Sequence, residues 1–296
     1  MKTAIRKKRT LALIRLMDDP DRSVHEAVEK ELLKEDSRII PALEEVWEST
    51  LDEICQDRIE SLIQQIQFRE KYRKLSSWVK QNPPDLLEGF LLVSRYHYPD
   101  LSVEKIERKI EEIRKKVWVE LNNSLTSLEK ITVLNHIFFN NFGYSVNHIN
   151  PSSPHNCFIN QLIETGKGNP VAISMLYTVV AQKLELPIHF IDFPKNPLLA
   201  FVDRKIAQKV HPKEINTDVL FYINPANKGS ITGRRELEFH LKRMNYEPYR
   251  KYFEASGPRR FLLRLLETLE KAYESNGFAD KASDIRLLTG ILSEDE

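Results

Sequence analysis

The chain has 296 residues, which is long for one hydrophobic core, so we expect two or more folded units. Its 44 Lys and Arg residues nearly balance 43 Asp and Glu residues, and the net charge of +1 provides no overall field favouring a nucleic acid or an anionic membrane. Glycine is scarce, with 9 residues, and 41% of the residues are apolar, which indicates a mostly helical globular protein.

Residues 1–80 show the spacing of apolar side chains that is typical of helices. Within "LMDDPDRSVHEAVEKELLKED", Val24, Ala27, Val28 and Leu32 recur three and four positions apart and predict one apolar stripe. The turn and helix of this segment resemble a HEAT-type repeat, in which stacked helix pairs bury a stripe that neither could bury alone. We therefore expect a HEAT-like helical region over residues 1–80.

The segment "KQNPPDLLEGF" predicts a break in the chain, because two consecutive prolines cannot continue a helix. Asp85 is placed to cap the helix that follows, and Ser102 is a candidate cap for the next one. These helices are predicted near 85–97 and 102–121. A further amphipathic helix is expected to end at Gly143.

Residues 170–184 are apolar nearly all round, which predicts a helix that is buried on every side. Pro170 suits the first turn of this helix. Three segments rich in β-branched and aromatic residues follow as predicted strands, at 187–193, 198–203 and 219–225. The segment "RRFLLRLLETLEKAYESNGFADKASDIRLL" predicts two helices joined by a turn.

The residues from about Asp85 to the C-terminus resemble the SirB-type family of bacterial proteins. The resemblance is carried by "PHNCFINQLIETGKGNPVAISMLYTVVAQKLELPIHFIDFP" and by "FYINPANKGSITGRRELEFHL". It implies a transglutaminase-like core followed by tetratricopeptide-like helices. The expected fold is α+β and mostly helical, with a buried central helix against a small antiparallel sheet. The domains are then 1–80 (HEAT-like), 81–245 (transglutaminase-like core with its entering helices) and 246–296 (tetratricopeptide-like hairpin).

The resemblance also implies where a catalytic triad would stand in enzymes of this fold. A Cys in the first turn of the central helix would be activated by the helix dipole, by a His on a neighbouring strand and by an Asp on the next. The matching positions here are Pro170, Asn196 in "FPKNPLLAF" and Asn224 in "INPANKG". Because proline has no nucleophilic atom and amides do not titrate near pH 7, we predict no inherited catalytic centre.

Other residues could substitute for this triad. Cys157 and His155 lie two positions apart at a predicted helix start and could form a thiol–imidazole pair for acyl transfer or amide hydrolysis. The alternative interpretation is a small buried residue ahead of Phe158, with His155 in a loop. Ser174 is expected to donate to a backbone carbonyl rather than to act as a nucleophile. The histidines lack the spacing of metal ligands, and the chain lacks glycine-rich phosphate-binding motifs, so we expect neither metal nor cofactor.

The asparagines of the vacated site are candidates for a binding cleft. Asn169, Asn196 and Asn224 are expected to line or border it, with Asn156 nearby, and their amides could hold an extended peptide. The alternative is a closed cleft in which the amides merely cap turns. We therefore expect a non-catalytic scaffold whose partner is a protein or a peptide rather than a nucleic acid or a membrane.

The two cysteines, Cys55 and Cys157, fall in segments assigned to different units, so the sequence does not imply a disulfide. No apolar run approaches the roughly 18 residues of a membrane helix. The apolar run near the N-terminus is short and contains Arg15, and no small-residue cleavage site follows it. A reduced, cytoplasmic location is expected.

Overall fold

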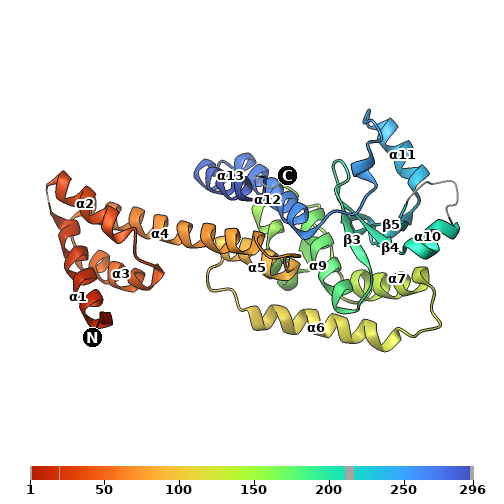
Figure 1. Ribbon diagram of the computed structural model, residues 1–296, viewed down its shortest axis with the longest axis horizontal. Helices are drawn as coiled ribbons and strands as arrows, with labels where there is room; N and C mark the ends of the chain where they lie inside the picture. Colours follow the sequence, from red (N-terminus) through yellow and green to blue (C-terminus); the bar gives the residue numbers. More distant parts are fainter. Residues whose placement is uncertain (1, 20, 211–216, 294–296) are drawn as a thin grey trace. The chain divides into compact units, whose positions relative to one another are not determined.

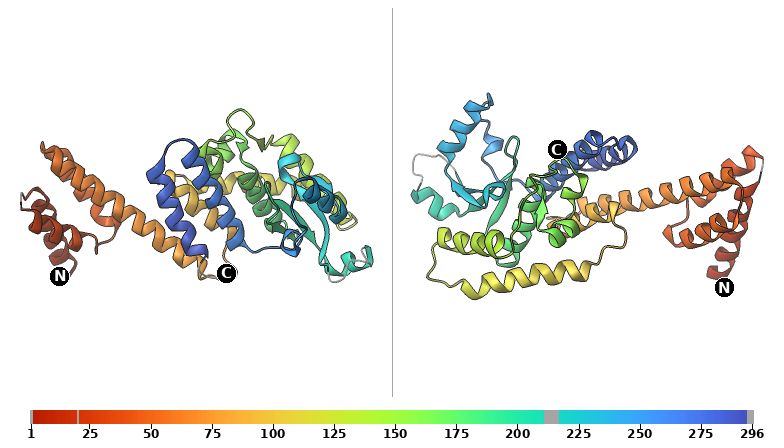
Figure 2. Two further views of the ribbon diagram at one scale, coloured as in Figure 1. Left: turned by 90° about the horizontal axis from the view of Figure 1, so that it is seen from above. Right: turned by 180° about the vertical axis from the view of Figure 1, so that it is seen from behind.

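The computed structural model describes residues 2–19, 21–210 and 217–293 (Figure 1). The chain divides into two compact units, residues 1–76 and 77–296. Most of the described residues are helical, and the strands are short and belong to the second unit (Figures 1 and 2). Among the residues described, no helix combines the length and the apolar character needed to cross a membrane.

The first unit is helical and has its own core. Its helices are α1 (Lys2–Arg15), α2 (Arg22–Leu32), α3 (Ile40–Ser49) and most of α4 (Glu53–Val79). Asp21 caps α2, because its carboxylate accepts the backbone N–H of Ser23 at 2.8 Å. The buried side chains of the core are Ile14, Met17, Val28, Leu32, Ile39, Leu43, Cys55, Ile59, Leu62 and Ile66. Ala27, which was expected in the stripe of α2, is exposed, because it lies on the flank of that stripe.

The second unit holds the remaining helices. They are α5 (Leu86–His97), α6 (Val103–Glu120), α7 (Ser127–Asn135), α8 (Ile159–Thr165), α9 (Pro170–Lys183), α10 (Arg204–Val210), α11 (Arg234–Arg243), α12 (Pro258–Ser275) and α13 (Ala279–Ser293). Asp85 and Ser102 cap α5 and α6 as predicted, accepting N–H groups at 2.7 and 3.3 Å. The helix predicted to reach Gly143 is α7 continued by a π-helical segment, His136–Asn141.

The strands of the second unit form a small antiparallel sheet. Its order is β3 (Ile188–Ile191), β4 (Leu198–Val202), β5 (Val219–Asn224) and β6 (Ser230–Thr232). The first three strands match the predicted segments. The sequence did not predict β6, nor the short parallel pair of β1 (Ser145–Val146) and β2 (Lys167–Gly168).

Helix α9 lies at the centre of the second unit, as predicted. All residues from Val171 to Ala181 are buried, because α9 contacts α5, α6 and α12 as well as strands β3 and β4 (Figure 2). The confirmed burial explains why its sequence is apolar nearly all round. The fold is therefore α+β and mostly helical, with a buried helix against a small sheet.

A polar contact joins α9 to the turn before β6. The Tyr177 hydroxyl donates to Asn135 Oδ1 at 2.8 Å, and Asn135 Nδ2 donates to the carbonyl of Gly229 at 2.8 Å. Gly229 has φ 73°, and a Cβ atom added there would lie 2.1 Å from Asn135 Oδ1. Glycine is therefore required both for the backbone conformation and for this close approach.

Candidate functional site

The start of α9 is the position where a thiol enzyme of this architecture would carry its nucleophile. Asn169 caps the helix, because its Oδ1 accepts the backbone N–H of Ala172 at 2.8 Å. Pro170 follows as the first helical residue, where its missing N–H costs no hydrogen bond. One turn on, the Ser174 hydroxyl donates to the carbonyl of Pro170 at 2.7 Å, as predicted. The first turn is thus built for helix initiation.

Cys157 lies next to this helix start but inside the protein. Its side chain is 1% exposed, and its sulfur accepts a hydrogen bond from Asn169 Nδ2 at 2.9 Å. Burial raises the pKa of the Cys157 thiol to about 12, and the bond from Asn169 offsets this increase in part. The desolvation of a thiolate therefore outweighs the favourable field of a nearby helix N-terminus. Burial therefore favours the protonated form of the Cys157 thiol.

His155 is exposed and lies two residues before Cys157, in the short 3₁₀ segment Pro154–Cys157. Its Nδ1 is 2.5 Å from the hydroxyl of Tyr98, a partner that the sequence did not suggest. The ring of His155 also meets the edge of His97, with the centroids 5.4 Å apart. The imidazole of His155 is thus held by His97, the last residue of α5, and by Tyr98, which follows it.

Asn156 and Asn169 are brought together, but their polar groups are used inside the fold. The N–H of Asn169 donates to the carbonyl of Asn156 at 3.0 Å. Asn156, which is 4% exposed, donates from Nδ2 to the carbonyl of Asn150 at 2.7 Å and accepts at Oδ1 from Asn147 at 2.9 Å. Both side chains hold the loop before α8 in place rather than face a ligand.

Asn196 and Asn224 lie at one end of the sheet. Asn196 is exposed in the connection between β3 and β4, two residues before β4 starts, and Asn224 is the last residue of β5. Leu199 of β4 pairs with Ile223 of β5, so these strand ends are adjacent. The Oδ1 of Asn224 is buried and accepts no hydrogen bond from the described residues.

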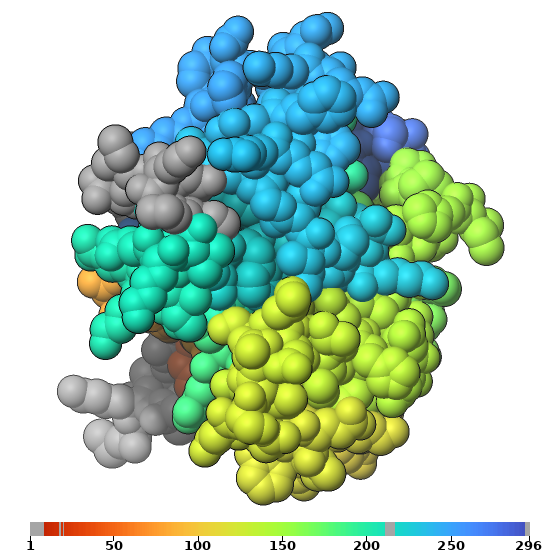
Figure 3. All heavy atoms as spheres, turned by 90° about the vertical axis from the view of Figure 1, so that its right-hand side faces the viewer, coloured from red at the N-terminus to blue at the C-terminus, as the bar shows by residue number. Residues whose placement is uncertain are grey.

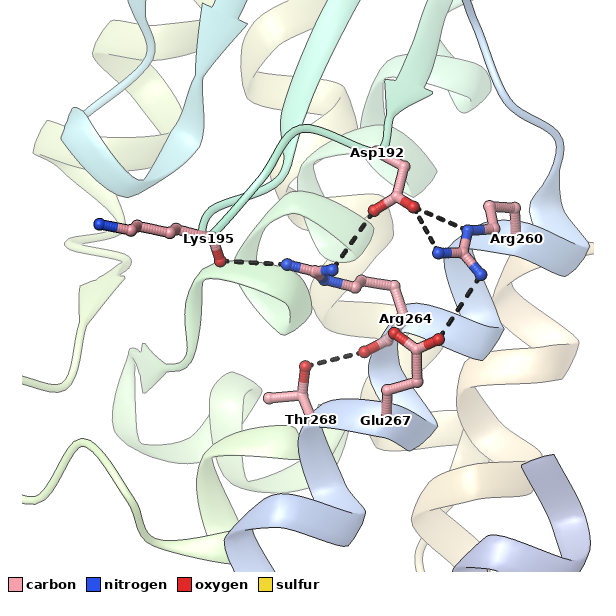
Figure 4. A network of polar contacts seen from close by, with 6 residues as sticks. All are labelled: Asp192, Lys195, Arg260, Arg264, Glu267 and Thr268. Carbon is pink, nitrogen blue, oxygen red and sulfur yellow. Dashed lines mark hydrogen bonds and ion pairs between the residues drawn. The ribbon is translucent and has the colours of Figure 1, made fainter. Parts of the chain in front are cut away.

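The connection that carries Asn196 is fastened to α12 by a network of ion pairs (Figure 4). Asp192 accepts from Arg260 Nε at 2.7 Å, and Arg264 Nη1 lies 3.6 Å from its other oxygen. Arg264 also donates to the carbonyl of Lys195 at 3.2 Å, and Glu267 lies 3.5 Å from Arg260. We call these contacts the Asp192 clamp. The sequence did not reveal it, because Asp192 and Arg260 are 68 residues apart.

We expect Asp192→Asn to lower the free energy of unfolding by about 1–3 kcal/mol, because it leaves two arginines of the clamp facing a neutral amide. The side chain of Asp192 is 17% exposed, so solvent screens the lost interaction only partly. Urea unfolding of the full chain measures the change. The matched control is Asp218→Asn, whose ion pair with Arg204 is 3.5 Å long and largely exposed. Equal effects of the two substitutions would contradict the clamp.

Around the start of α9, the described residues do not bring a thiol, a base and an orienting group into mutual hydrogen-bond contact. A triad needs a nucleophile, a base within hydrogen-bond reach and a group that orients the base. Here the first turn of α9 holds Pro170, and the thiol of Cys157 accepts a hydrogen bond from the Asn169 amide. The imidazole of His155 is hydrogen-bonded to the Tyr98 hydroxyl.

Comparisons with known proteins place these observations in a family. A family model described as "Transglutaminase-like superfamily" matches residues 104–267. A UPF0162 protein of Xylella fastidiosa is 25% identical over 205 residues, covering 67% of this chain and 68% of its own. The UPF0162 protein PA3419 of Pseudomonas aeruginosa is 21% identical over 197 residues, with the same coverage of 67% and 68%. No solved structure matches the chain significantly.

Proposed function

The chain belongs to the transglutaminase-like superfamily, and from this premise we propose that it is a non-catalytic member that binds another protein or a peptide. The observation that carries the proposal is Pro170 in the first turn of α9. Its ring nitrogen is part of the backbone amide, so the side chain offers no nucleophilic atom. The neighbouring thiol of Cys157 is buried and stays protonated at neutral pH.

The other triad positions support the same proposal. Asn196 and Asn224 carry neutral amides, which neither remove a proton from a thiol nor hold a positive charge on an imidazole. His155, the alternative base, is bonded to Tyr98 on the surface. A reaction would therefore need a nucleophile and a base from outside this helix start.

We place the binding surface away from the asparagines. Asn156 and Asn169 are buried and use their amides in internal hydrogen bonds, so they favour the closed alternative for this part of the cleft. The helical regions at the two ends of the chain offer better surfaces. We infer a HEAT-like character for the first unit and a tetratricopeptide-like character for the α12–α13 hairpin, because stacked helix pairs present extended surfaces to partners.

Exposed apolar side chains support binding by the first unit. Leu51 is 98% exposed and Ile54 is 62% exposed at the junction of α3 and α4, with Trp47 close by in the sequence. Large apolar groups at a surface are typical of contact sites.

Both cysteines are free and buried, which supports a reducing bacterial cytoplasm as the location of the proposed binding function.

Turnover assays of the full chain test the non-catalytic half of the proposal. The substrates are 4-nitrophenyl acetate for hydrolysis and a glutamine peptide for amine transfer. We expect the unmodified chain to turn over each substrate no faster than its Cys157→Ala and His155→Ala variants do. Turnover that either substitution abolishes would overturn the proposal and favour a thiol-dependent hydrolase or acyltransferase.

The binding half has its own test. The tagged full chain, isolated from the cells that make it, is expected to elute with a protein partner in size-exclusion chromatography. Elution without a partner, also after mild cross-linking in the cells, would contradict it.

A further inference from the structure

The charge of the second unit is concentrated at one end. We call the exposed side chains of residues 203–210 and 217–256 the α11 surface, which Figure 3 views from the side of α10 and α11. These residues contain ten Lys and Arg against six Asp and Glu, a net charge of +4. Because the whole chain has a net charge of +1, all other residues together carry −3. The α11 surface is thus basic on an otherwise slightly acidic protein.

Aromatic side chains are interleaved with these cations. Phe239 is 59% exposed and Tyr249 is 58% exposed, and Tyr246 lies between them in sequence at 39%. The guanidinium of Arg243 lies 6.0 Å from the Phe239 ring centre, and the Lys251 ammonium lies 5.9 Å from that of Tyr249. Cations held over exposed rings present charge and apolar area together, as partner-binding surfaces do.

A pocket of about 530 Å³ opens within this surface, between the ends of β4 and β5, the start of α11 and the segment after η6 (Arg250–Tyr252). Phe253 is one of its walls and is 3% exposed, with the Arg234 guanidinium 4.5 Å from its ring centre. The Tyr222 hydroxyl donates to the carbonyl of Phe253 at 3.0 Å and fixes this wall. The lining also includes the carboxylates of Asp218 and Glu254, so a side chain seated here must be uncharged or basic, and the volume accepts one or two such side chains.

We propose that the α11 surface binds an acidic segment of another protein, with an aromatic or aliphatic side chain of that segment seated in the pocket. The proposal rests on the proposed binding function and adds to it a surface distinct from the helical ends of the chain, together with the chemistry of the partner. Carboxylates of the segment would meet exposed cations such as Arg235, Lys242 and Lys251. The apolar anchor would sit against the apolar part of the pocket lining, at Val202 and Val219.

The carboxylates of the α11 surface favour a peptide over a nucleic acid. Glu238 pairs with Arg234 at 3.0 Å, and Glu254 pairs with Arg250, so both arginines that line the pocket already have acidic partners. A nucleic acid has a phosphate at every residue and would be repelled at these positions. A peptide, by contrast, does not carry a charge at every residue, so its carboxylates can lie only opposite exposed cations.

Fluorescence anisotropy with the full chain tests this proposal. The probe is a short fluorescein-labelled peptide of glutamates interrupted by phenylalanines, with a lysine version of the same peptide and a labelled oligouridylate as comparators. We expect the acidic peptide to bind best and its affinity to fall as salt is raised. The double variant Arg235→Glu with Lys242→Glu should weaken binding about tenfold or more.

Two further variants distinguish the contribution of charge to peptide affinity from the contribution of the pocket. Arg108→Glu with Lys115→Glu makes the same charge change on exposed positions of α6 and should leave the affinity within about twofold of the parent. Ala255→Trp, which fills the pocket from its exposed rim, should weaken the phenylalanine-containing peptide but not an all-glutamate one.

Three outcomes would overturn the inference: no binding of the acidic peptide, equal weakening by the α6 control, or tighter binding of the oligouridylate. None of them bears on turnover, so the non-catalytic proposal is tested separately.

Discussion

Leu176→Ala is expected to lower the free energy of unfolding of the second unit by about 2–5 kcal/mol. Leu176 has no exposed surface and lies in the middle of α9, where every neighbour along the helix from Val171 to Ala181 is also buried. Truncation removes apolar contacts with the surrounding helices and sheet and leaves a cavity that this packing cannot close. Urea unfolding followed by circular dichroism measures the loss.

The control for this substitution is Gln182→Ala, which lies on the same helix and is exposed. Because alanine favours the helix and Gln182 is outside the core, its effect should stay within about 0.5 kcal/mol. A loss well under about 1 kcal/mol for Leu176→Ala would show that α9 is not the packed centre of the unit.

Cys157 is expected to react with iodoacetamide about a thousandfold more slowly than an ordinary thiol at neutral pH. The pKa of Cys157 is raised from 9.0 to about 12, so the thiolate fraction below pH 9 falls by about three powers of ten. The sign follows from the thiolate being the charged form, which burial disfavours. Burial at 1% exposure slows alkylation further by excluding the reagent.

The measurement is the rate of carbamidomethylation by mass spectrometry in a Cys55→Ala background, which leaves one thiol. The same protein unfolded in urea gives the reference rate. The native rate should keep rising with pH beyond 9, where the unfolded reference levels off. A native rate that is already at its plateau below pH 7 would identify a reactive thiolate and revive thiol chemistry.

The sequence predicted those helices and strands whose formation depends on interactions between residues close together in the chain. The caps at Asp85 and Ser102, the span of α9 and the first three strands of the sheet follow from hydrogen-bonding side chains and from apolar periodicity within a few residues. The pair β1–β2 and strand β6 were missed, because strands of two or three residues are formed by long-range pairing rather than by their own composition.

The candidate site divides in the same way. The sequence placed Pro170 and Asn169 at the helix start and Asn156 near it, and in the structure the N–H of Asn169 donates to the carbonyl of Asn156. The sequence left open whether Cys157 would be a buried residue or half of a thiol–imidazole pair, because burial depends on the packing of distant helices. The Asp192 clamp and the contact of His155 with Tyr98 likewise join residues that are far apart in the chain.

The residues at the start of α9 have a consequence for the stability of this helix. A thiol enzyme must keep a desolvation-sensitive, reactive group in the first turn of its central helix, and that requirement competes with the best local choice for folding. Here Asn169 caps the helix and Pro170 fixes its first backbone angle, and both are among the residues that helices prefer at these positions. The residues at this helix start therefore suit helix initiation, without the compromise that a reactive thiol in the first turn would require. A cysteine in place of Pro170 would remove the fixed backbone angle from the first turn of α9 and so weaken this helix start.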